Sequence, residues 1–391
     1  MNIHFYIAKR FLSSINETGK FTSLISIIGI CIGSFALVIS ISVLNGFENK
    51  LDEKISNFDG HLKILDLNQN YDLTELKSIE SIIDLSFSLQ RKGIIKNNSS
   101  ESLVTFKQID FDKLKSFYNI PFVGDLSDGN KILIGNDIAS RLGLAIGDEV
   151  IISSPLDQSS ILGFPSAAKT HIGGIFYSKI LDYDNKFVFI SNTIGNKIFH
   201  NNSNLPSLDV KISDVSKLEM VKEKIINIVG KGNKVFSWKE KNAVLVSAIE
   251  MEKLGSIIVL SLIIVVACFS VISTISLITM KKIKDIGTLR LIGMNLIDVK
   301  KIIIFQTMII GSKGLFLGVF FGISSIFLQN HYEFITLPSE IYAMEVLPMV
   351  ITYQDILVVL IVNIFFIMST GAIGAKKFLK TDPLEMLKWV K

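Results

Sequence analysis

The chain has 391 residues, 49% of them hydrophobic, and a mean hydropathy of +0.47, which is high for a soluble enzyme. Its net charge of +4 is small and its basic residues gather at the edges of apolar runs, so we expect no nucleic-acid partner. The two cysteines lie inside apolar runs and the five histidines are scattered, so we expect neither a disulfide framework nor a metal site.

Residues 1–21 are predicted to form an amphipathic helix. Ile3, Ile7 and Phe11 recur every four residues, and the basic pair Lys9-Arg10 falls on the other side. Such a helix lies in the headgroup region of a membrane, here at the inner face.

Residues 22–45 are predicted to be the first membrane span. The apolar run is longer than the core of a signal peptide and no small-x-small cleavage site follows it, so we expect the span to be retained. Gly29 and Gly33 are spaced to let a second helix approach closely, although small residues are also common in membrane helices generally.

Residues 46–253 are predicted to fold as a large α+β domain inserted between the first and second spans. No apolar run in this region is long enough to cross a membrane, and turn signals separate short alternating segments. Helical spacing fits 137–142 and 215–228. The expected strands are 61–65, 102–109, 131–135, 149–153, 171–177 and 186–191.

A hook-like loop is predicted at 154–169, between two of these strands. Leu162 and Phe164 lie between prolines near its tip. The loop is either an ordinary hairpin connection or a device for docking a partner, because apolar groups at a loop tip otherwise reduce solubility.

Residues 254–280 and 302–328 are predicted to be the second and third spans, since each run exceeds the roughly 20 residues that cross a bilayer. The segment between them, 281–301, reads KKIKDIGTLRLIGMNLIDVKK and holds six basic residues against two aspartates. A short basic loop between spans belongs on the cytoplasmic side, and its apolar residues recur at helical spacing.

The remaining segments complete the predicted topology. Residues 329–353 contain no Lys or Arg, residues 354–375 form a fourth apolar run, and residues 376–391 are basic again. The distribution of basic residues therefore predicts four spans, both termini in the cytoplasm and the large domain on the outer side.

Lys313 is unusual because it falls within the third span. It either contacts a polar substrate group or a hydrated cavity, or belongs to a shifted span and extends towards the membrane surface. Gly314, Gly318 and Gly322 share one face of the same span, which favours close helix packing.

The sequence contains no phosphate-binding loop of the form G-x-x-x-x-G-K-[ST], no H-E-x-x-H and no G-x-S-x-G. We therefore expect no catalysis and no cofactor on this chain, and any energy source must lie on another subunit.

The whole chain resembles the lipoprotein-releasing ABC transporter permeases of the LolC/LolE family, within the FtsX/MacB-like permease superfamily, and leans towards LolC. The resemblance rests on stretches at 21–48 (FTSLISIIGICIGSFALVISISVLNGFE), 132–150, 173–184, 236–242, 283–311, 337–348 and 382–388 (DPLEMLK). It implies a bacterial inner-membrane protein that works with a cytosolic LolD-like ATPase dimer, which binds ATP and Mg²⁺. A LolE-like permease or a second copy would pair with it, and a periplasmic LolA-like carrier would accept the acylated lipoproteins.

The resemblance also assigns site residues. Contact with the ATPase is implied for Lys284, Asp285, Ile286, Gly287, Leu289, Arg290 and Gly293. The carrier-binding hook is implied at Ile161, Leu162, Gly163, Phe164 and Pro165, although the family pattern often has proline where this chain has Leu162. The hypothesis of mechanical transmission places lipid and substrate in a cavity near Ile39, Val43, Ile263 and Lys313.

Two other functions remain open at this point. One is an FtsX- or MacB-like permease acting on another substrate or on a cell-wall hydrolase, although no ATPase is fused to this chain. The other is a membrane anchor without transport activity, for which four spans and a patterned helical loop have no evident purpose.

Overall fold

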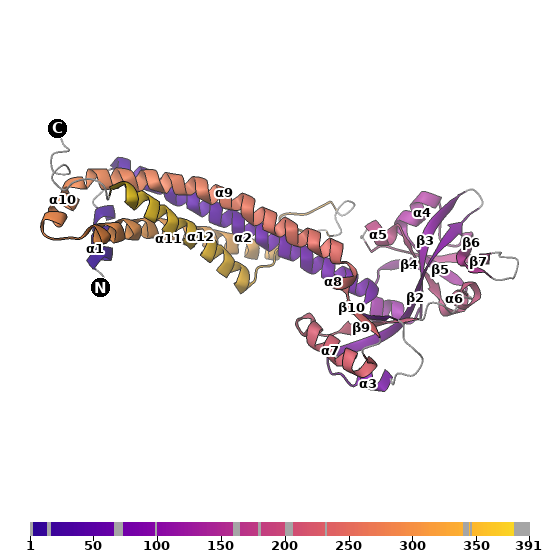
Figure 1. Ribbon diagram of the computed structural model, residues 1–391. Coiled ribbons are helices and arrows are strands. Elements are labelled where there is room, and N and C mark those ends of the chain that lie inside the picture. Colours follow the sequence, from indigo (N-terminus) through magenta and orange to yellow (C-terminus); the bar gives the residue numbers. More distant parts are fainter. Residues whose placement is uncertain are drawn as a thin grey trace. The chain divides into compact units, whose positions relative to one another are not determined.

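The computed structural model describes residues 3–13, 17–65, 73–97, 100–158, 165–178, 181–199, 206–230, 233–338, 344 and 346–378. The chain divides into two compact units. The helical unit comprises Met1–Glu48, Ser247–Thr336 and Val346–Lys391, and the sheet unit comprises Asn49–Val246 and Leu337–Glu345. Figure 1 labels their elements.

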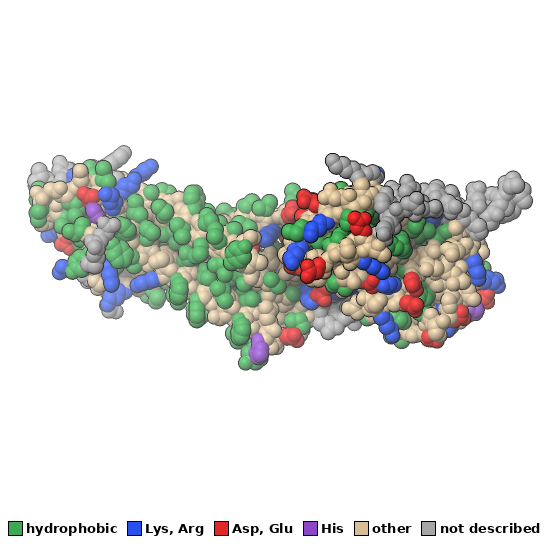
Figure 2. All heavy atoms as spheres, turned by 90° about the horizontal axis from the view of Figure 1, so that it is seen from below, with side chains coloured by type: hydrophobic (Ala, Val, Ile, Leu, Met, Phe, Trp, Pro, Cys, Tyr) green, Lys and Arg blue, Asp and Glu red, His purple; other side chains and the backbone are tan. Residues whose placement is uncertain are grey.

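The helical unit contains four helices that are long and apolar enough to cross a membrane, among the described residues. They are α2 (Glu17–Asp59), α9 (Ala243–Lys281), α11 (Leu296–Tyr332) and α12 (Tyr353–Phe378), accompanied by the shorter α1 (Ile3–Ser13) and α10 (Ile283–Leu291). Hydrophobic side chains cover most of the visible face of these helices (Figure 2), as a surface in contact with lipid requires.

Helix α2 is longer than the predicted span at 22–45. It has 43 residues, and its residues 49–59 belong to the sheet unit. The helix continues because Leu51, Ile55 and Phe58 recur at helical spacing and are buried. The outer domain predicted to start at residue 46 therefore begins within a helix. At the other boundary, α9 begins at Ala243 rather than at 254.

Glycines allow α2 to pack closely against two neighbours. A Cβ atom on Gly318 of α11 would lie 2.5 Å from the carbonyl oxygen of Cys31, and one on Gly322 would lie 2.6 Å from Val38. On α9 the neighbours are Ala267, 3.2 Å from a Cβ on Gly29, and Ile264, 2.9 Å from one on Gly33. The close helix approach predicted from these spacings is confirmed.

Two pairs of polar side chains join helices inside the bundle. Ser26 and Thr274 join α2 to α9 at 2.9 Å, and the Ser34 hydroxyl donates to the Asn363 side chain of α12 at 2.9 Å. Unpaired polar groups are costly in this environment, so these bonds fix the relative rotation of the helices.

Within its described residues, the sheet unit contains ten strands in the order β10-β1-β9-β2-β3-β8-β5-β7-β4, with β6 paired to β2 and β7. The pairs β3–β8 and β5–β7 are parallel, and the other described pairs are antiparallel. The strands are β1 (Leu62–Leu65), β2 (Ile82–Lys96), β3 (Glu101–Ile109), β4 (Phe122–Gly124), β5 (Lys131–Gly135), β6 (Glu149–Gln158), β7 (Pro165–Phe176), β8 (Phe187–Ser191), β9 (Ser207–Ile212) and β10 (Lys234–Ser237).

Two lobes share this sheet. The first lobe packs β1, β9 and β10 against α3 (Leu73–Lys77) and α7 (Leu218–Val229), and the second packs β3, β5 and β8 with α4 (Asn136–Leu142) and α6 (Asn192–Ile198). An aromatic cluster that includes Phe58, Phe117 and Phe189 adds a further core. The remaining short helices are η1 (Leu114–Tyr118), α5 (Leu181–Asp184), η2 (Val215–Lys217) and α8 (Trp238–Lys241).

The strands expected from alternating apolar residues are confirmed, but β2, β4, β9 and β10 were missed. Strand β2 has 15 residues, the most of any described strand, and contains the charged residues Asp84, Arg91 and Lys92 followed by Gly93. A Cβ atom at Gly93 would lie only 2.4 Å from a ring carbon of Phe106, so glycine here permits close packing and is no turn signal.

His61, which precedes β1, should make the sheet unit less stable in acid. The Ile212 backbone N–H donates to its Nδ1 at 3.3 Å, which requires the neutral ring. Burial, with a smaller effect from the Lys211 ammonium, lowers the pKa of His61 to about 4. The unfolded chain therefore binds more protons between about pH 6.5 and pH 4, and stability falls as the pH falls through this window.

We expect protonation of His61 in the unfolded chain to lower the unfolding free energy by roughly 3 kcal/mol between pH 7 and pH 4. The unfolding free energy of His61→Gln should not show this decrease. Trp238 is buried in this unit and can report denaturant unfolding once the second tryptophan is replaced (Trp389→Phe). His171→Gln, at an exposed site on β7, is the matched control. Equal pH dependence in the two variants would show that His61 does not carry the effect.

Candidate functional site

Helix α10 lies between the second and third long helices and has one buried face. Ile283, Ile286 and Gly287 are buried, whereas Lys284, Asp285 and Thr288 are exposed. The helix ends at Leu291, and Gly293 follows two residues later with a φ of +106°, which favours glycine, and an N–H that donates to the Arg290 carbonyl at 3.0 Å. This closure turns the chain into α11.

The buried face of α10 belongs to the main core of the helical unit. Ile283 and Ile286 share one hydrophobic cluster with Ala8 and Phe11 of α1, Ile275 and Ile278 of α9, Val299 and Ile302 of α11, and Ala375 of α12. Because α9, α11 and α12 all supply buried residues to this cluster, a displacement of α10 acts on several long helices together.

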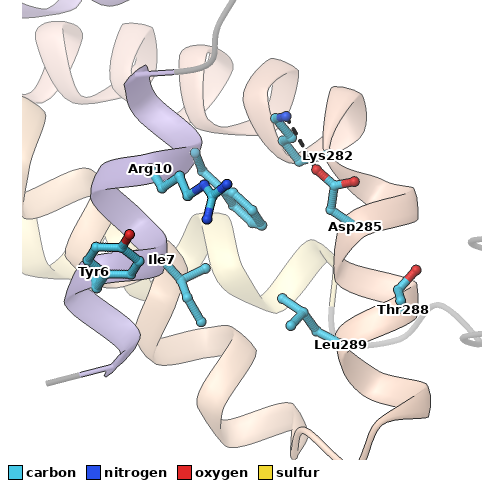
Figure 3. Close-up of a pocket in the computed structure, with 8 residues that line it drawn as sticks. Tyr6, Ile7, Arg10, Lys282, Asp285, Thr288 and Leu289 are labelled. Carbon is cyan, nitrogen blue, oxygen red and sulfur yellow. Dashed lines mark ion pairs between the residues drawn. The ribbon is translucent and has the colours of Figure 1, made fainter.

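Basic residues are frequent at the end of the helical unit that contains α1 and α10. The exposed or half-buried ones are Lys9, Arg10, Lys20, Lys281, Lys282, Lys284, Arg290, Lys300, Lys301 and Lys376. Asp285 pairs with Lys282 at 3.3 Å (Figure 3), and Asp298 contacts His4 at 2.9 Å and Lys301 at 3.3 Å. The excess of positive charge matches the cytoplasmic side of a membrane protein.

The end of α10 and the start of α11 carry an exposed apolar surface that sequence reasoning missed. Leu291 is 60% exposed, Ile292 80% and Ile297 63%. These three residues form what we call the α10 tip. The residues predicted for ATPase contact lie beside it on two faces, with Ile286 and Gly287 turned inward and Lys284, Asp285 and Gly293 outward. Leu289 and Arg290 are half-buried. Only the structure distinguishes the exposed isoleucines from the buried ones.

The four residues predicted to line a lipid or substrate cavity are not brought together. Ile39 and Val43 pack against a cluster formed with Ile264 and Met349. Ile263 is 40% exposed on α9. Lys313 instead lines a separate hollow of about 180 Å³ beside Lys20, near α1.

The residues predicted for the hook, Ile161–Phe164, lie outside the described residues, and for Pro165 only its place in β7 is described. The flanking strands β6 and β7 pair antiparallel, with Ser154 opposite Ser166 and Gln158 opposite Pro165. The loop predicted at 154–169 is therefore too long: residues 154–158 and 165–169 belong to β6 and β7, because the ladder between the two strands extends beyond their alternating apolar segments.

A polar network also joins three long helices. The Lys253 ammonium donates to the Asn45 side chain at 2.7 Å, and Asn45 donates to Asp355 at 2.7 Å. Thr352 completes the network through Asp355. These residues link α9, α2 and α12, and no sequence spacing could have paired them.

A buried ion cluster fixes the C-terminal end of α2 within the sheet unit. Lys107 is fully buried; its ammonium donates to the Phe58 carbonyl and to Asp59 at 2.8 Å, and lies 3.5 Å from Asp209. Lys63 contacts Asp209 at 3.2 Å. Burial lowers the pKa of Lys107, and the two carboxylates oppose that effect. Lys107 thereby caps the last turn of α2, where carbonyl groups carry partial negative charge.

Comparison with known proteins identifies the family. The family model of the MacB-like periplasmic core domain matches residues 23–228, more than half of the chain, and that of the FtsX-like permease C-terminal region matches residues 257–383.

Relatives match over nearly the full length. The lipoprotein-releasing system transmembrane protein LolC of Buchnera aphidicola subsp. Schizaphis graminum is 26% identical over 94% of each chain. LolC of Neisseria meningitidis serogroup B is 23% identical over 98% of each chain, and LolE of Haemophilus influenzae is 22% identical over 99% of each. The resemblance seen in the sequence is confirmed, and the chain belongs to the family of membrane permeases that combine a MacB-like core domain with an FtsX-like C-terminal region.

Proposed function

We propose that this chain is the permease subunit of an ATP-driven complex that takes acylated lipoproteins from the inner membrane and passes them to a periplasmic carrier. The observation that carries the proposal is the match to LolC and LolE relatives along essentially the whole chain. The basic end of the helical unit would face the cytoplasm together with both termini, and the sheet unit would lie in the periplasm.

Helix α10 and the α10 tip would receive the movement of a separate LolD-like ATPase dimer, which would bind ATP and Mg²⁺. Lys284, Asp285, Leu289, Arg290 and Gly293 would surround the contact, while Ile286 and Gly287 would hold the helix to its core. The exposed apolar tip supports this role, because such groups usually become buried at an interface.

The long helices would carry that movement to the sheet unit. Helix α2 supports this step, since it begins in the helical unit and is capped by Lys107 in the sheet unit. A partner permease, either LolE-like or a second copy, would complete a cavity for lipid and acyl chains near Ile39, Val43 and Ile263. The position of Lys313 favours a role at the membrane surface instead.

The function is tested by reconstituting the full-length chain with its co-purifying ATPase in proteoliposomes that contain a labelled lipoprotein. We expect ATP to release the label into the soluble fraction only when the carrier is present. If no ATPase co-purifies and the label stays in the membrane, the proposal is wrong.

The hook is proposed to bind the carrier, because the sequence that connects β6 to β7 contains the apolar residues Leu162 and Phe164. Phe164→Glu should weaken carrier capture roughly tenfold or more, as expected for loss of an aromatic anchor, without changing ATP hydrolysis. A pull-down with immobilised carrier measures this, and Phe164→Leu is the conservative control. If Phe164→Glu captures the carrier as well as the natural chain does, the hook is not the carrier-binding site.

A further inference from the structure

A pocket of about 510 Å³ lies between α1 and α10 (Figure 3). Its polar lining consists of Tyr6, Arg10, Lys282, Asp285 and Thr288, and its apolar lining of Ile7, Phe11 and Leu289. A site with hydrogen-bond donors beside an apolar wall suits a molecule that is charged at one end and hydrocarbon at the other.

The charge of the pocket is positive. Lys282 and Asp285 form an ion pair at 3.3 Å, so these two side chains balance each other. In the described part of the chain, the Arg10 guanidinium has no carboxylate partner, and it points between the two helices in Figure 3. The Tyr6 hydroxyl lines the same space and can donate a further hydrogen bond, whereas the Thr288 hydroxyl already donates to the Lys284 carbonyl at 3.0 Å.

The position of the pocket indicates where its ligand comes from. Helix α1 packs on the start of α11 through the edge-to-face contact of Phe5 with Phe305, whose ring centroids lie 5.9 Å apart. It nevertheless exposes Ile3 by 65% and Tyr6 by 49%. An amphipathic helix with exposed apolar and aromatic residues beside the ends of membrane spans lies at headgroup depth. The pocket therefore opens where lipid phosphates are concentrated.

We propose that this pocket binds the headgroup of an anionic phospholipid from the leaflet that surrounds α1 and α10. The phosphate would be held by Arg10 with the Tyr6 hydroxyl, and the first part of an acyl chain would lie against Ile7 and Leu289. Basic pockets at the cytoplasmic ends of membrane helices bind acidic lipids in this way. Only the assignment of this leaflet as the cytoplasmic one rests on the proposed function.

Lipid binding is measured on the purified full-length chain in detergent by native mass spectrometry. Phosphatidylglycerol and phosphatidylcholine with identical acyl chains are titrated separately. We expect phosphatidylglycerol to bind its first site at least about tenfold more tightly, because both lipids carry a phosphate but the quaternary ammonium of phosphatidylcholine cancels its net charge and is repelled by Arg10. Arg10→Gln should remove this preference, and Arg10→Lys should restore part of it.

Lys9→Gln is the matched control, because Lys9 is an exposed residue of the same helix that does not line the pocket. Retained preference in Arg10→Gln, or equal loss in Lys9→Gln, would overturn the proposal. Displacement of the lipid by millimolar inorganic phosphate would overturn it in favour of a soluble anion. Loss of ATPase association by Arg10→Gln in lipid-free detergent would instead assign the pocket to an acidic side chain of a protein partner.

These measurements use neither ATPase nor lipoprotein for the primary result. The lipid preference can therefore fail while release activity stands, and release can fail while the preference stands. If Arg10→Gln does not yield folded protein, Tyr6→Phe removes the second proposed donor and should reduce the preference without changing net charge.

Discussion

Replacing Ile292 by glutamate is expected to abolish both co-purification of the ATPase and ATP-dependent lipoprotein release. Ile292 is 80% exposed at the α10 tip, so the substitution leaves the fold of the helical unit unchanged. In the complex, the carboxylate would enter an apolar contact without a partner. We expect ATPase binding to weaken roughly a hundredfold, which corresponds to loss of a strong interface residue.

Affinity capture of the ATPase by the purified permease measures the first effect, and release from proteoliposomes measures the second. Ile292→Val keeps an apolar side chain at the same position and should behave like the natural chain. Glutamate at this position with normal ATPase capture would show that the α10 tip is not the contact surface.

Replacing Lys107 by methionine should destabilise the sheet unit by about 3–5 kcal/mol, because removing one partner of a buried ion cluster leaves uncompensated carboxylates. The change removes the ammonium that contacts Asp59, Asp209 and the Phe58 carbonyl. We also expect lipoprotein release to be lost while ATPase capture persists, since the proposed ATPase contact belongs to the helical unit.

Lys92→Met is the control, because Lys92 is an exposed lysine on the neighbouring strand β2. Denaturant unfolding followed by Trp238 fluorescence gives the stability difference, and capture and release are assayed as above. A Lys107→Met protein that unfolds like Lys92→Met but no longer releases lipoprotein would still support transmission through α2. Full stability and full release together would rule out both roles for Lys107.

The sequence predicted the membrane part of the fold well because long apolar runs depend on composition alone. The helix contacts predicted at Gly29/Gly33 and Gly314/Gly318/Gly322 are also present, since residues four apart share one helix face. Helix ends were harder to predict. Residues 49–59 of α2 are too polar to cross a membrane, yet their apolar positions recur at helical spacing and are buried in the sheet unit.

The site was only partly predictable. Charge and periodicity located α10, but exposure decides which residues can contact a partner, and Ile286 and Ile292 look alike in sequence while differing from 5% to 80% exposed. The buried cluster joins Asp59, Lys107 and Asp209, which are far apart along the chain. Pairings of this kind depend on strand register, which a single sequence does not reveal.

Strand β2 limits how the outer unit can deform. Residues 82–88 pair with β9 of the first lobe, and residues 89–96 pair with β3 of the second. Because one extended backbone runs through both ladders, the lobes cannot open against each other without breaking hydrogen bonds along that strand. The sheet unit should accordingly behave as one rigid body whose two lobes keep a fixed relative orientation. Any conformational change that grips a partner would then be confined to its loops.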